Sequence, residues 1–314
     1  MQLKEKRALV TGSSGVIGRV LLEKLVHLGV EVLGIDLVPP SQSIDRCRYI
    51  TADLSAGVPD AAFDFAPELV FHLAASFERT VETAGYWKTV FKNDVLASHR
   101  LLEAVEPLKS LQVFVFASSY LNYDPSLYLD VPHVRKLKES DCLLPRNMVG
   151  LAKYYMDREL EFVQSTQANF RTVSARIYRV YGRGSRDVIS RWVRSSLAGE
   201  ELKVFGTNNR FDYIFADDVA EGLIRLSETE NAVGPVNLGS GVSRSIEDVL
   251  GILSKETGGA RIKREPYDGP IESSAADMSL FQRLTGWIPS TSLELGIRKI
   301  AEYEKQLHGP LAAR

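Results

Sequence analysis

The strongest constraint on the fold is a glycine-rich turn close to the start of the chain. An apolar run over residues 7–11 leads into the turn, which reads TGSSGVIG over residues 11–18, and a helical pattern begins at Val16. Glycines in such a turn permit a tight bend, close approach of a pyrophosphate and close packing of helix on strand. The free N–H groups of the helix N-terminus favour phosphate charge. The pattern predicts a dinucleotide site with these residues: Gly12, Ser14, Gly15, Val16, Ile17 and Gly18.

An acidic residue follows at the distance expected for ribose recognition. A second strand, predicted over residues 31–35, is followed by Asp36, 18 residues after Gly18. A carboxylate at this position accepts hydrogen bonds from both hydroxyls of the adenosine ribose and repels a 2′-phosphate. The two features together favour NAD over NADP. The alternative is a glycine turn without a ligand and an aspartate that only solvates a loop, and it does not explain their spacing.

Strand-like and helix-like patterns alternate through the first half of the chain. Apolar runs predict further buried strands at residues 69–73, 113–117 and 171–176, and helical patterns cover residues 86–106 and 149–165. Apolar strands separated by amphipathic helices are typical of a parallel sheet that is covered on both faces, with right-handed crossovers. The predicted fold class is α/β, a doubly wound parallel sheet of the Rossmann type with a smaller C-terminal substrate-binding lobe.

Composition excludes several classes of protein. The net charge of −2 lacks the basic surplus of a general nucleic-acid or anionic-membrane binder. No apolar stretch approaches the roughly 20 residues that a membrane-spanning helix needs. The two cysteines, Cys47 and Cys142, and five scattered histidines show no disulfide framework and no metal-ligand spacing. We expect no metal, no signal peptide, no nucleic-acid or membrane partner, and a cytoplasmic location.

Short motifs after the turn extend the pattern. They are Asp53-Leu54, the segment HLAA at residues 72–75, and Asn93. In order and spacing they resemble the extended short-chain dehydrogenase/reductases, the NAD-dependent sugar epimerase/dehydratase group. In that family the acidic–aliphatic pair holds the adenine, and the HxAA segment lines the cofactor channel. The resemblance implies these further cofactor residues: Asp53, Leu54, Leu73, Ala74, Ala75, Asn93, Lys153 and Tyr178.

Motifs in the second half resemble the nucleotide-sugar members of this family. RIYRVYG at residues 176–182 resembles RxxNVYG, with Arg179 at the asparagine position, and RFDYIFADD at residues 210–218 resembles RDxixVxD. In the family the arginine of RDxixVxD grips the substrate diphosphate. Arg210 takes that position here, and the alternative is that Arg210 only forms a surface salt bridge. NLGSG at 237–241 and LTGWIP at 284–289 resemble NxGxG and LGWxP. The resemblance implies a nucleotide-diphosphate sugar as partner, held by Ser118, Ser119, Arg179 and Arg210.

The same resemblance implies how the chain is divided and assembled. It places an NAD-binding domain in residues 1–178 plus 211–242, and a nucleotide-sugar-binding lobe in residues 179–210 plus 243–314. It also implies a homodimer that packs the helices at 86–106 and 149–165 against their copies. Asp268-Gly269-Pro270 stands about where relatives carry a second diphosphate-binding arginine, and Arg179, Arg183 and Arg186 are candidates to replace it. We interpret the basic stretch at 133–138 as a solvated loop.

The catalytic motif departs from the family at one position. The family removes a proton from a sugar hydroxyl with a tyrosine, assisted by a lysine and a serine, while the same carbon gives a hydride to the nicotinamide. Ser119 takes the serine position at the end of a predicted strand, and Lys153 takes the lysine position. The tyrosine position, four residues before Lys153, holds Val149, which cannot transfer a proton. The tyrosines directly after Lys153 face elsewhere on the helix.

Three explanations of Val149 remain open. Another residue supplies the acid and base, with Tyr120, Tyr123, Tyr178 and His133 as candidates; or the substrate needs no strong base at that oxygen; or catalysis has been lost, naturally or by engineering. The last explanation leaves a catalytically silent NAD- and nucleotide-sugar-binding protein. The retained Ser119 and Lys153 favour an enzyme.

The residues after Ser119 narrow the reaction. Family 4,6-dehydratases carry an Asp-Glu pair there because elimination of water needs its own acid and base. This chain has Tyr120-Leu121-Asn122 instead, which disfavours a dehydratase. A 4-epimerase, a 4-ketosugar reductase and a sugar-nucleotide dehydrogenase remain. The NAD signal favours the epimerase, which recycles its cofactor in place.

Overall fold

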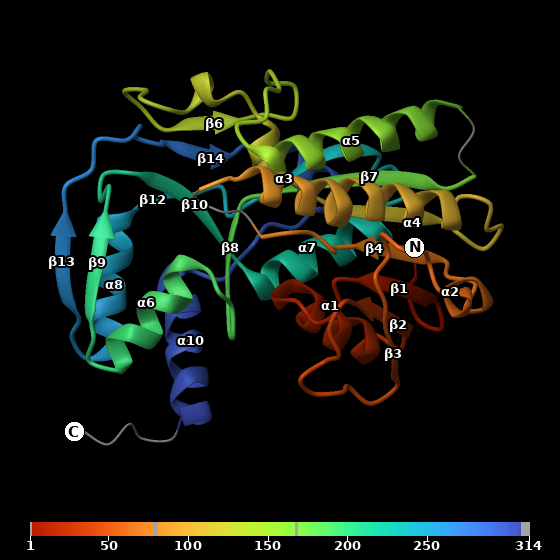
Figure 1. Cartoon of the computed structure of the whole chain (residues 1–314), viewed down its shortest axis with the longest axis horizontal. Coiled ribbons are helices and arrows are strands. Elements are labelled where there is room, and N and C mark those ends of the chain that lie inside the picture. The colour runs from red at the N-terminus through yellow and green to blue at the C-terminus, as the bar shows by residue number, and fades with distance from the viewer. Residues whose placement is uncertain (1, 78–80, 167–168, 309–314) are drawn as a thin grey trace.

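The computed structural model describes residues 2–77, 81–166 and 169–308 (Figure 1). Within these residues the central sheet has seven strands in the order β11-β7-β5-β4-β1-β2-β3, and every neighbouring pair is parallel. This arrangement confirms the predicted doubly wound parallel sheet. In chain order the strands are β1 (Arg7–Thr11), β2 (Glu31–Asp36), β3 (Cys47–Thr51), β4 (Leu69–His72), β5 (Val113–Ser119), β7 (Arg171–Ile177) and β11 (Gly234–Leu238).

Helices cover both faces of this sheet, which explains its continuous apolar strands. On β1, Val10 packs into a core with α1, α7 and α9, whereas Leu9 packs into a second core with α2, α4 and α5. A strand that is buried on both faces needs apolar residues at successive positions. The covering helices are α1 (Val16–His27), α2 (Asp60–Asp64), α3 (Ala84–Val90), α4 (Ala97–Val105), α5 (Met148–Thr166), α7 (Ala216–Glu228) and α9 (Ser279–Thr285).

A smaller lobe with its own apolar core lies beside the sheet, at the left of Figure 1. Side chains such as Val193, Phe215, Leu250 and Ile297 meet in this core. One small sheet joins β12, β10 and β8, and another pairs β13 with β9. The predicted second lobe is therefore present. Its elements are β8 (Arg179–Tyr181), α6 (Val188–Leu197), β9 (Glu201–Phe205), β10 (Arg210–Phe215), β12 (Ser243–Ser245), α8 (Ile246–Thr257), β13 (Arg261–Glu265) and α10 (Leu293–His308).

The segment between Ser119 and α5 is more ordered than the sequence predicts. Two short 3₁₀ helices, η2 (Tyr120–Asn122) and η3 (Pro125–Leu127), precede β6 (Arg135–Leu137), which pairs in parallel with β14 (Ser274–Ala276). Leu137 is fully buried, and its carbonyl accepts a hydrogen bond from the Asn237 amide. The interpretation of 133–138 as a solvated loop therefore holds for its side chains other than Leu137, which are exposed, and is wrong for the backbone, which forms β6. The strand that pairs with it lies far along the chain, where local sequence gives no sign of it.

Two further features concern the described residues alone. They contain no helix with both the length and the apolar character needed to cross a membrane. They also contain no group of three or more histidine, cysteine, aspartate or glutamate side chains suited to a metal ion. Cys47 and Cys142 are both free thiols.

Candidate active site

A cavity of about 2240 Å³ opens at the carboxyl ends of β1, β4, β5 and β7, between the sheet and the smaller lobe. Pockets for one small molecule commonly measure about 300–1,000 Å³, so this cavity has room for two ligands side by side. Every predicted site residue except Arg210 lines it: Gly12, Ser14, Gly15, Val16, Ile17, Gly18, Asp36, Asp53, Leu54, Leu73, Ala74, Ala75, Asn93, Ser118, Ser119, Val149, Lys153, Tyr178 and Arg179.

The glycine turn packs against the loop after β4 and against α1 too closely to admit side chains at Gly12 and Gly18. Gly12 has a φ of +68°, and a Cβ there would lie 2.7 Å from the Ala74 nitrogen. A Cβ at Gly18 would lie 2.2 Å from the Gly12 carbonyl oxygen. Both distances are shorter than real Cβ atoms show, so only glycine permits this packing of α1 on the turn. The turn fits a dinucleotide diphosphate, with the N-terminus of α1 directed at it.

Asp36 lies at the end of β2 and is tied to this turn. One carboxylate oxygen accepts a hydrogen bond from the Ser14 N–H at 2.9 Å, and the other accepts one from the Val38 N–H at 3.2 Å. A carboxylate oxygen can accept two hydrogen bonds, so both keep a lone pair for a ribose hydroxyl. The structure thus shows how Asp36 is fixed at the cavity, and the ribose contact stays a prediction.

Asp53 lies at the predicted adenine end of the cavity. Its carboxylate accepts hydrogen bonds from Lys92 Nζ at 2.8 Å and from Ser55 Oγ at 2.6 Å. The bond from Lys92, followed by those from Ser55, lowers the pKa of Asp53 to about 2. Leu54 beside it is buried. The pair therefore offers a fixed anionic group next to an apolar wall.

A buried network holds the HLAA segment in the cavity wall. His72 is fully buried, with Nδ1 2.6 Å from Thr11 Oγ1 and Nε2 2.7 Å from Ser98 Oγ. Burial, with a smaller effect from the charge of Lys153, lowers the pKa of His72 to about 3, so the ring stays neutral. Thr11 Oγ1 also accepts a hydrogen bond from the Ala74 N–H. His72 thus acts as a structural residue that joins β1, β4 and α4.

A π-helical segment, η1 (Phe91–Leu96), carries Asn93 to the cavity. It lies between α3 and α4, within the helix predicted over 86–106, and π segments are frequent at functional sites. The adjacent Asp94 is buried and accepts a hydrogen bond from the Ser76 N–H at 2.6 Å. Burial raises the pKa of Asp94, against the opposing effect of the charge of Lys153. Asp94, which the sequence analysis does not single out, therefore fixes the loop after β4.

Lys153 brings a buried positive charge to the inner wall. Its side chain is 7% exposed, and its ammonium nitrogen lies 4.6 Å from the centre of the Phe116 ring. Burial lowers the pKa of Lys153 to about 8, while Asp94 and Asp157 act in the opposite direction. Val149 lies one turn earlier on α5, and both residues line the cavity.

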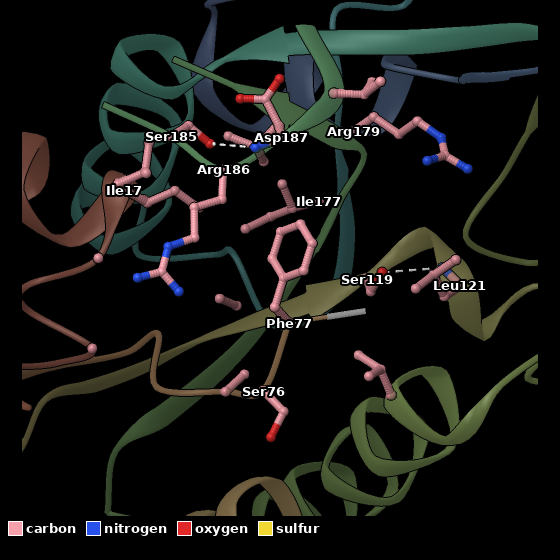
Figure 2. Close-up of a pocket in the computed structure, with 18 of the residues that line it drawn as sticks. Ile17, Ser76, Phe77, Ser119, Leu121, Ile177, Arg179, Ser185, Arg186 and Asp187 are labelled. Atoms are coloured by element: carbon pink, nitrogen blue, oxygen red, sulfur yellow. Dashed lines mark hydrogen bonds between the residues drawn. The ribbon is translucent and has the colours of Figure 1, made fainter. Parts of the chain in front are cut away.

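The two serines at the end of β5 combine local structure with access to the cavity. Ser118 Oγ accepts a hydrogen bond from the Asn122 amide at 3.1 Å. Ser119 Oγ accepts one from the Leu121 N–H at 3.2 Å and caps η2 (Figure 2). A serine hydroxyl that accepts one bond still has its own proton to donate. Capping and substrate contact are therefore compatible at Ser119.

The structure separates the four candidates for the missing acid and base. Tyr123 is fully buried outside the described cavity lining, and its hydroxyl donates to Asn237 at 2.7 Å. Burial raises the pKa of Tyr123 to about 12. His133 also lies outside the described lining. Tyr120 and Tyr178 both line the cavity, with ring centres 4.9 Å apart in a stacked pair.

β10 presents Phe211, not Arg210, to the cavity. Side chains alternate along a strand, so Phe211 and Tyr213 line the cavity while Arg210 lies on the other face, 4.0 Å from Asp248. This geometry contradicts the prediction that Arg210 binds the substrate, and the alternative of an exposed ion pair fits it. On the neighbouring β8, Arg179 lines the cavity with its guanidinium 4.0 Å from the centre of the Phe211 ring.

A buried ion cluster that sequence reasoning missed lies at the lobe end of the cavity. Arg146, just before α5, donates to Glu272 at 2.7 Å, and Arg179 lies 3.5 Å from the same oxygen. Burial raises the pKa of Glu272, but the charges of Arg179 and Arg146 outweigh it and keep the pKa below its ordinary value. No motif connects residues this far apart in the chain, so no sequence signal could have found the cluster.

Two other side chains extend into the cavity in Figure 2. Phe77 comes from the loop after β4, and Arg186 comes from the loop after β8. Arg186, a candidate for binding the diphosphate, extends into the cavity that Ile17 of the glycine turn also lines. The cavity that holds the predicted cofactor site is therefore also lined by a cation from the loop after β8.

Comparison with known proteins places this geometry in a family. The profile of the "NAD dependent epimerase/dehydratase family" matches residues 8–239. The UDP-glucose 4-epimerase of Mycolicibacterium smegmatis is 26% identical, over 95% of this chain and 98% of that protein. The dTDP-L-rhamnose 4-epimerase of Burkholderia thailandensis is 23% identical, over 96% and 95%.

A solved structure agrees with these sequence relatives. MoeE5 in complex with UDP-glucose and NAD superimposes with a TM-score of 0.84 and 26% identity, and the match covers 96% of this chain and 99% of that chain. The family match confirms the predicted NAD dependence. The motifs, the doubly wound sheet and these comparisons agree, and the chain belongs to the NAD dependent epimerase/dehydratase family.

Proposed function

We propose that the protein is an NAD-dependent enzyme of nucleotide-diphosphate sugars that oxidises and reduces a sugar carbon, as a 4-epimerase or, second, as a 4-ketosugar reductase. One observation carries the proposal: a single cavity joins the glycine turn, the Ser119–Lys153 pair and Arg179 of the smaller lobe. The relatives named as 4-epimerases of UDP- and dTDP-sugars, and the complex of MoeE5 with UDP-glucose and NAD, support the substrate class.

In this proposal the chain holds NAD along the sheet edge. The glycine turn takes the diphosphate, Asp36 the adenosine ribose, and Asp53 and Leu54 the adenine. The nicotinamide half lies against the remaining cofactor residues: Leu73, Ala74, Ala75, Asn93, Lys153 and Tyr178. Bound NAD supplies a reversible hydride acceptor.

The residues around the sugar would prepare the hydroxyl for oxidation. Ser119 is placed to hydrogen-bond the reacting oxygen, with Ser118 beside it. The buried ammonium of Lys153 favours negative charge that develops on that oxygen. Val149 contributes no proton transfer, so in this proposal another group supplies the acid and base.

The predicted division of the chain becomes part of the proposal with one adjustment. We assign residues 1–178 and 216–242 to the NAD-binding domain, and residues 179–215 and 243–314 to the nucleotide-sugar lobe. The adjustment rests on β10, which pairs with β8 and β12 and adds Phe215 to the lobe core. The free thiols of Cys47 and Cys142 support a reducing, cytoplasmic location.

A homodimer through α3, η1 and α5 is supported by exposed apolar side chains on these neighbouring helices. Trp87 and Phe91 are 47% and 59% exposed on the first two elements. Leu151, Tyr155 and Phe162, spaced for one face of α5, are 47%, 46% and 67% exposed. A contiguous apolar face of this kind marks an interaction surface, and a second copy would cover it.

Native mass spectrometry of freshly purified protein tests the proposal. We expect a dimer that releases NAD(H) on gentle denaturation, and any nucleotide sugar released with it names the substrate. Release of NADP(H) would contradict the role of Asp36 and favour a reductase. A protein that releases no dinucleotide and shows no NAD binding by calorimetry would overturn the proposal, and a monomeric mass would overturn the dimer.

A catalytically silent binding protein is the second candidate, and Val149 is the observation that favours it. Turnover of a nucleotide sugar by the unaltered chain excludes it. If the unaltered chain is inactive, a gain of turnover in Val149→Tyr would show simple loss of the tyrosine. No gain in that variant would exclude simple loss at this position as the explanation.

Arg179→Ala should weaken binding of UDP-glucose, whereas Arg210→Ala should not. A charge-assisted contact to a diphosphate contributes about 1.5–3 kcal/mol, which corresponds to a rise in Kd of about 10- to 150-fold. Arg210 is the matched control because it lies on the adjacent strand and faces away from the cavity. Titration calorimetry with both variants measures this. Equal Kd values for Arg179→Ala and the unaltered chain would contradict the role of Arg179.

A further inference from the structure

Tyr120 is the cavity-lining tyrosine that lies next to Ser119 in the chain. It directly follows Ser119, and it belongs to the apolar cluster that contains Val149. Of the tyrosines in this cluster, Tyr120 and Tyr178 line the cavity. Tyr120 therefore lines the cavity from η2, directly after β5, and Val149 lines it from α5.

A guanidinium contacts the Tyr120 hydroxyl. Arg146 Nη2 donates to the hydroxyl oxygen at 3.4 Å, and the guanidinium carbon lies 5.7 Å from the ring centre. Glu272, itself buried, holds the other side of this guanidinium through a 2.7 Å bond to Arg146 Nη1. An acid or base oriented by a second group, which is oriented by a third, is the usual construction of a proton-transfer site.

Two guanidinium groups lie beside the ring of Tyr120. Besides Arg146, the guanidinium of Arg179 lies 5.9 Å from its ring centre. Among the residues that the structure describes, the titratable groups next to the ring include Tyr178, stacked at 4.9 Å, and Tyr128 at 6.3 Å, and Glu272 lies behind the arginines. A cation that donates to a phenol oxygen stabilises its deprotonated form, which is what Lys153 does for the tyrosine in the family motif.

Tyr178 lacks such an environment. Burial is the largest influence and raises the pKa of Tyr178 well above its ordinary value, and nearby acidic groups, Asp212 and Glu139 among them, raise it further. Its hydroxyl is buried without a hydrogen-bond partner in the described structure. A phenol held neutral in this way is a poor base.

We infer that Tyr120, held by Arg146, is the acid–base residue that takes the place of the tyrosine absent at Val149. This inference rests on the proposed function. The O–H bond of the sugar alcohol breaks and its proton moves to the Tyr120 oxygen, while the C–H bond of the same carbon breaks and its hydrogen leaves with both electrons to oxidised NAD. The alcohol becomes a ketone. On the return of the hydride, Tyr120 gives the proton back.

Kinetics of Tyr120→Phe, with Tyr128→Phe as matched control, test the inference. We expect Tyr120→Phe to lower kcat by about 10²- to 10⁴-fold, the usual contribution of a positioned acid–base group. Tyr128 contacts the same guanidinium, with its ring centre 5.8 Å from the Arg146 carbon, but lies outside the described cavity lining. Tyr128→Phe should stay within about threefold of the unaltered chain, since it removes no acid–base group.

Absorbance of tyrosinate in the cofactor-free protein gives a readout that is independent of turnover. The difference between the unaltered chain and Tyr120→Phe isolates one tyrosine out of 12. This ionisation should move to higher pH in Arg146→Gln and return in Arg146→Lys, which restores a cation. A merely structural Arg146 would not shift this signal with charge.

The possible outcomes separate the inference from the proposed function. A Tyr120→Phe variant that keeps full turnover, or an ionisation unchanged in Arg146→Gln, overturns the inference and leaves the proposed function standing. An unaltered chain without turnover on UDP-glucose, UDP-glucuronic acid or dTDP-rhamnose overturns both. If Tyr120→Phe does not fold, the arginine variants test the inference instead. We then expect Arg146→Gln to lower kcat and Arg146→Lys to restore it. Recovery of turnover in a Tyr120→Phe, Val149→Tyr double variant supports the inference directly.

Discussion

Gly18→Ala should abolish NAD binding and destabilise the protein, the largest effect that we expect from a single methyl group. The new Cβ would lie 2.2 Å from the Gly12 carbonyl oxygen and 2.9 Å from the Ser13 Cα. Both are backbone atoms of the turn, so the clash is relieved only by moving α1 away from it. Overpacking of this kind costs about 1–3 kcal/mol of unfolding free energy. Opening the turn also displaces the N–H groups that would hold the diphosphate, so we expect a rise of at least about 100-fold in the Kd for NAD.

Gly251→Ala is the matched control because the same substitution at this position should raise the free energy of unfolding instead of lowering it. Gly251 lies inside α8, and a Cβ there would meet nothing within 4 Å. Alanine in the interior of a helix is more favourable than glycine by about 0.5–1 kcal/mol. Urea denaturation and titration calorimetry of both variants measure the effects. If Gly18→Ala binds NAD within about tenfold of the unaltered chain, the turn is not the diphosphate site.

The features that the sequence predicted well are those in which the signal is local. The turn at residues 11–18 lies between a strand and a helix in the structure, as its glycines require. The five predicted strands and both long predicted helices are present, because each carries an uninterrupted apolar or amphipathic pattern. Two strands of the sheet gave no such pattern. β3 (Cys47–Thr51) is a half-exposed edge strand, and β11 (Gly234–Leu238) begins with Gly-Pro, a pair typical of a turn.

The error at Arg210 has a simple geometric origin. A motif match that is displaced by one residue turns every side chain of a strand to the opposite face. Alternation along β10 puts Phe211 and Tyr213 on the cavity side, and the buried Asp212 shares the other face with Arg210. The guanidinium above Phe211 comes instead from Arg179, on the strand next to β10. The strand pattern alone would have corrected the assignment.

The part of the site that could not be predicted depends on contacts between distant segments. Arg146 donates hydrogen bonds to Glu272, 126 residues away in the sequence, and to Tyr120, 26 residues away. Neither partner belongs to a motif, and each would be interpreted alone as an exposed charge or a core aromatic residue. Their meeting is set by the pairing of β6 with β14, which also has no local signal. The sequence therefore gives Tyr120 only as one of four candidates, and the fold distinguishes it from the other three.

Lys153→Met should make the protein more stable at neutral pH while it removes activity. Burial lowers the pKa of Lys153 from 10.5 to about 8, so the folded state holds this charge less readily than the unfolded chain does. That difference corresponds to a cost of about 3 kcal/mol in unfolding free energy at pH 7. Methionine is apolar and of similar length, so the variant should recover much of this free energy. Without the ammonium that stabilises charge on the reacting oxygen, kcat should fall by about 10²- to 10³-fold.

The pH dependence of the unfolding free energy distinguishes removal of a buried charge from better packing as the cause of the added stability. Below pH 8 the lysine is charged in both states and the full cost is present. Between about pH 8 and 10.5 the folded protein has released the proton and the unfolded chain has not. The unaltered chain therefore gains stability relative to Lys153→Met as the pH rises, by about 1.4 kcal/mol per unit, and the two converge near pH 10.5. Lys255→Met, at an exposed position on α8, should change stability by less than about 0.5 kcal/mol. If the difference in unfolding free energy between Lys153→Met and the unaltered chain stays constant with pH, the added stability comes from packing and not from removal of a buried charge.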